Sequence, residues 1–304
     1  MGRRRDGGRG PDRARRHDRR GGDLGRNLAP FRLLALDIDG TLLRTDKRLS
    51  PRVRSAVLAA RARGVTVVLV TGRRPPAARR VAEELGGGFT LVLHNGALVV
   101  EDGELVRALP LPRDAALRAI DLGREAGLDP VVHVGQRGEG KLLAEGLCPS
   151  STLLSYYLDK SHPDVIVVRR LEDALQEDPI QVMFGDRLGV IDAFHGPLAR
   201  ALEGEASVER TVYPAQGIGL IDVLHRDVGK AAAVEFLCRR LGIASEEVMA
   251  IGDNWNDRAL LEAAGRGIVM GNADPALRAL GLEVAPSNDE DGAAWAIETH
   301  LLLR

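Results

Sequence analysis

The 304-residue sequence has few cysteines, few aromatic residues and only four lysines, and each scarcity narrows the class of protein. Its two cysteines, Cys148 and Cys238, form no C-x-x-C pair, so neither a zinc knuckle nor a disulfide framework is predicted. The chain contains no apolar run of about 18 residues, so no membrane-spanning segment or membrane partner is expected. We therefore expect a cytoplasmic protein with reduced thiols.

The formal net charge of −1 hides an uneven distribution. Residues 1–30 carry ten arginines and four aspartates, which gives a net charge of +6 and leaves −7 for the rest of the chain. This Arg/Gly-rich segment has almost nothing to bury, so it is predicted to be a disordered tail. Because it has no aromatic residue for base stacking, a solvated leader is favoured over an RNA-binding arm, and no specific nucleic-acid partner is expected.

From residue 31 the pattern is that of a folded protein. Over the whole chain 44% of the residues are hydrophobic and 28% are charged, near globular averages. Strand-length apolar runs alternate with helically spaced segments in the order β-α-β-α-β up to residue 93. These strands are apolar throughout, which is typical of a parallel sheet covered on both faces. A hairpin at 97–109 follows, and the α/β order resumes after residues 219–224.

These segments predict an α/β fold in which residues 31–110 and 215–304 form a Rossmann-like, doubly wound parallel sheet. Residues 111–214 mix helices and strands without the regular alternation, so they are predicted to form an inserted α+β domain. The core is therefore expected to be discontinuous in sequence.

Two aspartates follow the first predicted strand, in the segment Asp37-Ile38-Asp39-Gly40-Thr41. In an ideal strand this spacing puts both carboxylates on one face, at the strand end where open α/β sheets bind ligands. Adjacent carboxylates repel, so the pair needs a cation, most simply a hard divalent metal with oxygen ligands. Gly40 permits a sharp turn that leaves backbone N–H groups for an anion.

A second acidic segment, Gly252-Asp253-Asn254-Trp255-Asn256-Asp257, follows another apolar strand and precedes a helix. It delivers a further pair of carboxylates, Asp253 and Asp257, to the carboxyl end of a strand. Two such acidic strand ends in one parallel sheet predict a magnesium site.

Two further elements indicate phosphate binding. Thr71-Gly72-Arg73 ends the second strand, where a hydroxyl and loop N–H groups can bind phosphate oxygens. For Arg73 a structural ion pair and a substrate contact both stay open. Lys230 opens a helix in a chain that otherwise uses arginine for nearly every basic position, which favours a need for a compact point charge there.

These four segments, in this order along the chain, resemble the sequence motifs of the haloacid dehalogenase superfamily of phosphohydrolases. The matches to its motifs I to IV are Asp37–Thr41, Thr71–Arg73, Lys230 and Gly252–Asp257. His94-Asn95-Gly96-Ala97, followed by a hairpin, resembles the Cof-type branch with a type IIB cap. The resemblance covers roughly residues 31–110 and 215–304, while the insert matches only in position and α/β character.

The resemblance implies a Mg²⁺-dependent phosphatase of small phosphorylated metabolites that forms an aspartyl-phosphate. Asp37 is then the nucleophile, and Asp39 is the general acid and base. The implied metal residues are Asp37, Asp39 through its backbone carbonyl, Asp253 and Asp257. The implied phosphate-binding or substrate-binding residues are Gly40, Thr71, Gly72, Asn95, Lys230 and Asn256. The insert is expected to close over the core as a cap that selects the leaving group.

Two other functions remain open on the same scaffold. One is a phosphotransferase such as a phosphomutase, which shares the core motifs. The other is a non-catalytic protein that binds phosphorylated metabolites. The sequence identifies neither the substrate nor the oligomeric state.

Overall fold

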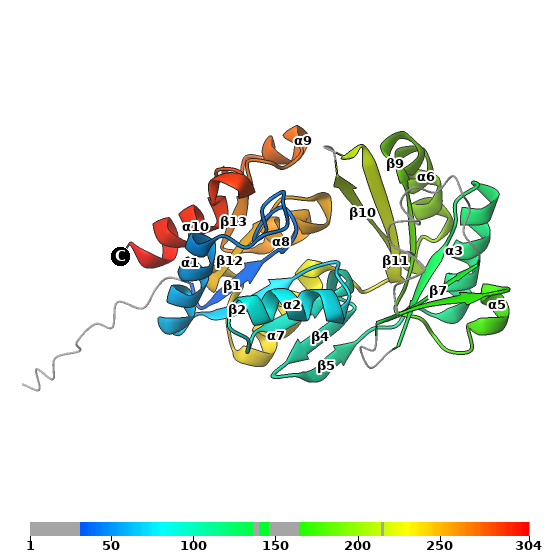
Figure 1. Ribbon diagram of the computed structural model, residues 1–304, viewed down its shortest axis with the longest axis horizontal. Coiled ribbons are helices and arrows are strands. Elements are labelled where there is room, and N and C mark those ends of the chain that lie inside the picture. Colours follow the sequence, from blue (N-terminus) through cyan, green and yellow to red (C-terminus); the bar gives the residue numbers. More distant parts are fainter. Residues whose placement is uncertain (1–30, 136–139, 146–163, 214–215, 304) are drawn as a thin grey trace, which may run out of the picture.

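The structure is a computed structural model that describes residues 31–135, 140–145, 164–213 and 216–303. The predicted disordered tail, residues 1–30, lies outside the described residues. The described chain forms two lobes, each built around its own sheet (Figure 1). Within these ranges no helix combines the length and the apolar character needed to cross a membrane.

The larger lobe contains an eight-stranded sheet in the order β14-β13-β12-β1-β2-β3-β4-β5. Its strands are β1 (Leu33–Leu36), β2 (Thr66–Val70), β3 (Thr90–Leu93), β4 (Leu98–Glu101), β5 (Glu104–Ala108), β12 (Val248–Gly252), β13 (Arg266–Val269) and β14 (Glu283–Val284). Neighbours from β14 to β3 pair in parallel, and the predicted hairpin adds β4 and β5 antiparallel at one edge.

Helices cover both faces of this sheet. They are α1 (Pro51–Ala62), α2 (Pro75–Glu84), α7 (Lys230–Leu241), α8 (Arg258–Ala263), α9 (Pro275–Arg278) and α10 (Gly292–Ile297). Short 3-10 turns follow β3 (η1, His94–Gly96), precede β12 (η3, Ser245–Glu247) and α8 (η4, Trp255–Asp257), and precede α10 (η5, Asn288–Glu290), while a π-helical turn (η6, Glu298–Leu302) ends the chain.

Alternate residues of β1 enter different cores, as the pleat of a strand requires. Leu34 and Leu36 pack in the cluster that includes residues of α1, α2 and α10. Leu33 and Ala35 pack on the opposite side with residues of α7 and α8. Because the central strands β1 and β12 are buried on both sides, they contain no polar alternation. The predicted fold class, a doubly wound parallel sheet with an inserted α+β domain, is confirmed.

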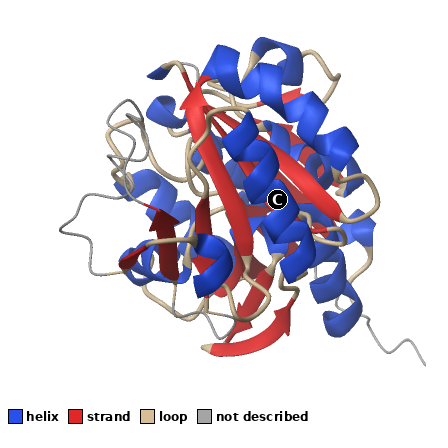
Figure 2. Ribbon diagram, turned by 90° about the vertical axis from the view of Figure 1, so that its right-hand side faces the viewer, coloured by secondary structure: helices blue, strands red, loops and turns tan. Residues whose placement is uncertain are grey.

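The smaller lobe is the inserted domain, here called the cap, and Figure 2 turns it toward the viewer. Its six-stranded sheet has the order β10-β11-β9-β6-β7-β8. The strands are β6 (Val131–Val134), β7 (Lys141–Glu145), β8 (Val165–Val168), β9 (Gln181–Arg187), β10 (Ala206–Tyr213) and β11 (Ile218–His225). The helices are α3 (Arg113–Glu125), α5 (Leu171–Ala174) and α6 (Leu188–Ala201), and α3 and α6 pack on one face of the sheet.

The boundary between cap and core differs from the prediction. The core is predicted to resume at residue 215, but β11 pairs antiparallel with β10 and β9 and so belongs to the cap sheet. An apolar run that is buried on both sides has the same sequence pattern in the core sheet and in the cap sheet. Hydrophobic periodicity therefore could not show to which of the two sheets residues 218–225 belong. The cap therefore extends to about His225, and the core resumes just before α7.

Close packing of α3 against β9 depends on Gly123. An added Cβ at this position would lie 2.1 Å from Cε1 of Phe184, which is fully buried and stacks edge-on against Phe194 with ring centroids 5.5 Å apart. Helix and strand can therefore approach this closely only because residue 123 has no side chain.

We expect Gly123→Ala to destabilise the cap by about 1–3 kcal/mol, because the methyl group overpacks the Phe184 ring. Gly189→Ala in α6 is the matched control, since a Cβ there meets no atom within 4 Å. Urea unfolding of both variants, followed by circular dichroism, tests this. Equal stabilities for the two variants would show that the α3–β9 contact tolerates a methyl group.

Candidate active site

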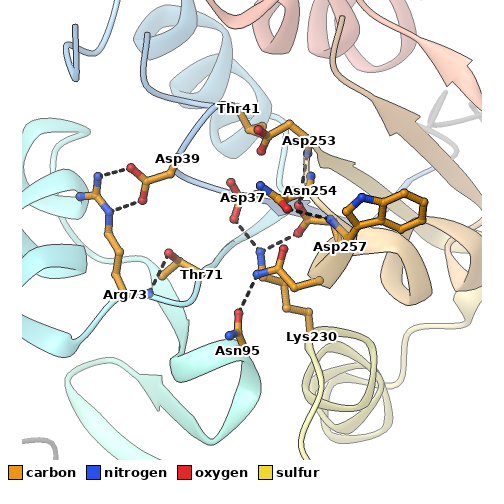
Figure 3. A network of polar contacts seen from close by, with 12 residues as sticks. Asp37, Asp39, Thr41, Thr71, Arg73, Asn95, Lys230, Asp253, Asn254 and Asp257 are labelled. Carbon is orange, nitrogen blue, oxygen red and sulfur yellow. Dashed lines mark hydrogen bonds and ion pairs between the residues drawn. The ribbon is translucent and has the colours of Figure 1, made fainter. Parts of the chain in front are cut away.

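The candidate site lies where the carboxyl ends of β1, β2 and β12 meet the first turn of α7 (Figure 3). Asp37 follows β1 directly, and its N–H donates to the carbonyl of Ile251 in β12 at 3.0 Å. Thr71 follows β2, and Asp253 follows β12. Parallel strands end at the same edge of a sheet, so three separate segments bring polar side chains to one place.

Lys230 is the central cation of the site. Its Nζ donates to Oδ1 of Asp37 and to Oδ1 of Asp257, each at 2.6 Å. All three residues are buried, and Lys230 is only 2% exposed. The other carboxylate oxygen of Asp257 accepts hydrogen bonds from the backbone N–H groups of Asp253 and Asn254 at 3.2 and 3.1 Å. Asp257 therefore anchors both the lysine and the acidic loop.

Asp253 is packed against the turn that follows Asp37. Its Oδ1 accepts a hydrogen bond from Thr41 Oγ1 at 3.3 Å, and its Oδ2 accepts one from Asn272 Nδ2 at 3.4 Å. Gly40, with φ of 79°, has no room for a side chain, since its Cβ would lie 2.1 Å from Oδ2 of Asp253. The turn and the acidic loop thus touch only because residue 40 is glycine.

The electrostatics of the site show an excess of negative charge. Burial raises the pKa of Asp37 to about 7; the Lys230 ammonium opposes this rise and the charge of Asp257 adds to it. Desolvation, followed by the charges of Asp37 and Asp257, holds the pKa of Asp253 well above its usual range. Burial by itself would lower the pKa of Lys230, but the two carboxylates raise it, so the ammonium stays charged.

The carboxylates of Asp37, Asp253 and Asp257 fit a divalent cation. One oxygen from each lies within 4.8 Å of the others. Hard oxygen donors of this kind are the ligands that Mg²⁺ and Ca²⁺ prefer, and a cation would offset the charge that one lysine leaves uncompensated. The identity of the ion as Mg²⁺ stays a prediction of the sequence.

The Asp39 side chain does not join this cluster. Its carboxylate forms a bidentate pair with Arg73 (Nε–Oδ2 2.5 Å, Nη2–Oδ1 2.7 Å) and a further bond with Lys47 at 3.0 Å. Burial raises the pKa of Asp39, but the hydrogen bonds and charges of Arg73 and Lys47 outweigh it, and the pKa falls below its usual value. Of the two alternatives for Arg73, the structure shows the ion pair.

The expectation that Asp37 and Asp39 share one face of a strand is wrong. Strand β1 ends at Leu36, and the N–H of Leu42 bonds the carbonyl of Ile38 in a tight turn. The turn directs the Asp37 side chain toward Lys230 and the Asp39 side chain toward Arg73 (Figure 3). Period-two alternation does not apply after a strand has ended.

The remaining predicted residues surround the same point. Thr71 is buried, and its Oγ1 accepts a hydrogen bond from the N–H of Arg73 at 3.1 Å. The Asn95 amide oxygen accepts a bond from Asn256 Nδ2 at 2.9 Å, and a Cβ on Gly72 would lie 3.1 Å from that oxygen. The structure therefore brings every predicted phosphate-binding residue to the edge of the sheet that holds Asp37.

The cap closes a pocket of about 70 Å³ over these residues. Its core side includes Asp37, Asp39, Thr71 and Asn256, and its cap side is lined by His133, Gln181, Met183, Thr211, Tyr213, Leu220 and Asp222. Arg74 reaches from the core to the cap, where it bonds the carbonyl of Gly140 and pairs with Asp164.

Sequence reasoning did not place the cap residues Gln181 and Asp222 at the site. Asp222 Oδ2 accepts a bond from Asn95 Nδ2 at 2.9 Å, and its Oδ1 accepts one from Gln181 Nε2 at 3.0 Å. Burial, with the charge of Glu209 opposite it in β10, raises the pKa of Asp222 to about 7. The sequence does contain a sign of this role, since Asp222 is the one acidic residue in the apolar run of β11. A buried polar residue in a strand needs hydrogen-bond partners, which indicates a polar neighbour.

The comparisons with known proteins agree with this geometry. Residues 34–297 match the family model of haloacid dehalogenase-like hydrolases. The HMP-PP phosphatase of Serratia proteamaculans is 31% identical over 258 residues, which are 82% of this chain and 87% of that protein. Pyridoxal phosphate phosphatase YbhA of Escherichia coli K12 is 28% identical over 278 residues, which are 89% of this chain and 99% of that protein.

A solved phosphatase structure, BT1666 from Bacteroides thetaiotaomicron, shares this fold with a TM-score of 0.75 at 24% identity. The match covers 93% of this chain and 99% of that one. Together these findings confirm the predicted resemblance to the haloacid dehalogenase superfamily and the expected enzyme class, a phosphatase of that superfamily.

We expect the metal-free protein to lose stability as the pH rises through about 7. The folded-state pKa of Asp37 is raised to about 7 and that of Asp253 is held well above its usual range. The stabilisation that protonation of these groups gives is therefore complete below the unfolded pKa near 4. It disappears as these groups ionise. Millimolar MgCl₂ should therefore raise the melting temperature more at about pH 8 than at about pH 5, as thermal unfolding with and without EDTA can measure.

Asp253→Asn should lose most of this Mg²⁺-dependent rise, because it removes one charged ligand. Asp102→Asn, in the exposed turn between β4 and β5, should keep it. An equal rise in the two variants, or an equal rise at both pH values, would place the cation elsewhere.

Proposed function

Because the chain belongs to the haloacid dehalogenase-like hydrolase family, we propose that it hydrolyses small phosphomonoesters through an aspartyl-phosphate on Asp37. The observation that carries this proposal is the buried Asp37 carboxylate, held 2.6 Å from Lys230 at the floor of the pocket. A carboxylate fixed by one oxygen is oriented for attack with the other.

In the first step an Asp37 oxygen attacks phosphorus, a new P–O bond forms, and the ester P–O bond breaks. Asp39 gives its proton to the departing alkoxide. In the second step Asp39 takes a proton from water, the water oxygen attacks phosphorus, and Asp37 is released together with inorganic phosphate. Asp39 thus regains in the second step the proton that it gave in the first, so the enzyme is unchanged at the end.

Lys230, Thr71 and backbone N–H groups next to Gly40 and Gly72 bind the phosphoryl oxygens in this proposal. The Lys230 ammonium is already desolvated, so its attraction for developing negative charge is stronger than in water. Asn95 and Asn256 hold the loops that carry these donors. The same ammonium keeps one Asp37 oxygen in place through the reaction.

We assign Mg²⁺ to Asp37, Asp253 and Asp257, with the backbone carbonyl of Asp39 as a further ligand. When bound, the ion supplies the positive charge that lets an anionic carboxylate meet an anionic phosphate. The raised pKa values of Asp37 and Asp253 support this assignment, because both carboxylates favour ionisation once a cation is near.

Asp39 must exchange partners to act as the acid. Its carboxylate is paired with Arg73 and Lys47, which holds it in the ionised form. Arg73 thus acts as a positioning residue in this proposal: it holds Asp39 beside the pocket until a substrate oxygen competes for the carboxylate.

The proposed substrates are small phosphorylated metabolites. The cap leaves only about 70 Å³ between itself and the core, which suits a small leaving group better than a polymer. The similar proteins from Serratia proteamaculans and Escherichia coli are named for HMP-PP and for pyridoxal phosphate, both small phosphorylated molecules. A cytoplasmic location stays a prediction of the sequence.

Asp37→Asn should lower phosphate release from p-nitrophenyl phosphate by at least about a thousandfold, because the amide cannot form the acyl phosphate. Its melting temperature should not fall, since the amide relieves charge in a buried site. A malachite-green assay with MgCl₂ measures release, and Asp102→Asn serves as the matched control.

Turnover of Asp37→Asn within tenfold of the wild-type rate would reject Asp37 as the nucleophile. Conversion of a hexose 1-phosphate to the 6-phosphate without release of phosphate would instead identify a phosphomutase. Absence of turnover by the wild-type protein across a phosphomonoester panel would favour the non-catalytic alternative.

A further inference from the structure

One face of the cap sheet forms the roof of the pocket, and His133 of β6 lies on it. Val132 packs on the opposite face with α3 and α6, while its neighbour Val131 packs with Met183 and Leu220, two residues of the roof. Alternation along β6 therefore places His133 on the roof face. It lies beside Gln181 in the sheet register and lines the pocket together with Asp37 and Asp39.

His133 is buried without a hydrogen-bond partner for its ring. It is 2% exposed, and neither Nδ1 nor Nε2 has a hydrogen-bond partner within the described parts of the chain. Its ring contact is an edge-on packing against His94, with centroids 5.3 Å apart. A buried polar group without a partner is unfavourable, so a residue that lines the pocket in this state is suited to bind a ligand.

The polar groups around His133 already have partners. His94 Nδ1 and Gln181 Oε1 are 3.1 Å apart, and Gln181 in turn bonds Asp222. Arg74 bonds the carbonyl of Gly140 and pairs with Asp164. Of this group, His133 is the one with both polar atoms left for a molecule in the pocket.

The ring of His133 is neutral. Burial, followed by the charges of His94 and Arg74, holds the pKa of His133 well below its usual range. A neutral imidazole offers one donor and one acceptor. This pair matches a hydroxyl group, which also donates and accepts, whereas a carboxylate or a second phosphate offers only acceptors.

We propose that His133 determines substrate specificity by binding a hydroxyl group of the leaving group, so that hydroxylated alkyl phosphates are preferred over their deoxy counterparts. The assignment rests on the proposed phosphatase function and extends it to the part of the substrate that is released. A leaving group without a hydroxyl leaves the imidazole without a hydrogen-bond partner in the closed pocket. The site therefore discriminates against substrates that lack the hydroxyl group.

The test compares kcat/KM for two matched pairs of substrates, with p-nitrophenyl phosphate as a reference. The pairs are glycerol 3-phosphate with n-propyl phosphate, and glucose 6-phosphate with cyclohexylmethyl phosphate. Wild-type protein should prefer the hydroxylated member of at least one pair. His133→Phe keeps a planar ring and should lower kcat/KM for that member by about tenfold or more. It should leave p-nitrophenyl phosphate and the deoxy member within about twofold.

Two further variants separate binding from structure. His133→Gln restores a donor and an acceptor and should recover part of the preference that His133→Phe loses. His195→Phe, at a cap histidine on α6 whose Nε2 lies 3.3 Å from the carbonyl of Val208, is the matched control and should keep the wild-type preference.

Three results would overturn the assignment. One is a wild-type protein that hydrolyses p-nitrophenyl phosphate but prefers the hydroxylated member of neither pair. Another is a His133→Phe variant that keeps the wild-type preference. The third is a His133→Phe variant that loses activity equally on all substrates, which would indicate a structural role for His133. Failure of the wild-type protein to hydrolyse p-nitrophenyl phosphate or any other member of the panel would reject the proposed function itself, and the specificity assignment with it.

Discussion

The site depends on the buried ammonium of Lys230, which lies between the carboxylates of Asp37 and Asp257. A charge removed from water is stable only when it is paired, so the Lys230 ammonium needs a carboxylate beside it. The three residues come from the end of β1, the start of α7 and the turn after β12, and up to 220 positions of sequence separate them. The edge of the sheet therefore cannot rearrange locally without exposing a charge or leaving one unpaired.

The same balance explains why the site is suited to phosphate. One ammonium compensates part of the charge of Asp37, Asp253 and Asp257, while burial, followed by the charge that remains, raises the pKa of Asp37 and Asp253. A divalent cation reverses this imbalance and makes the edge attractive to an anion. Residues 31–304 have a net charge of −7, yet three of their carboxylates, Asp37, Asp253 and Asp257, meet where a cation would neutralise them. Net charge consequently says little about what this protein binds.

Most of the core and the core half of the site could be predicted from the sequence. Apolar strands that end in Asp37, Thr71 and Asp253 predict a parallel sheet, and parallel strands bring their ends together whatever the loop lengths. The direction of Asp39 could not be predicted in this way, because it depends on a tight turn after the strand and on a partner, Arg73, from another strand end. The cap half was also missed: in a mixed antiparallel sheet, strand order and the face toward the pocket depend on tertiary packing, as β11 shows.

Side chains at the pocket join the cap to the core. Asn95 joins the two lobes, since its amide oxygen bonds Asn256 of the core and its amide nitrogen bonds Asp222 of the cap. His94 and Gln181 form a second bond across the same boundary. Water can replace such bonds at small net cost. Apolar packing also crosses the boundary, because the core cluster on the α1 side of the sheet includes the cap residues Ile180 and Leu224. The roof is therefore held over the Asp37 floor by side-chain hydrogen bonds together with the packing of these two apolar residues against the core.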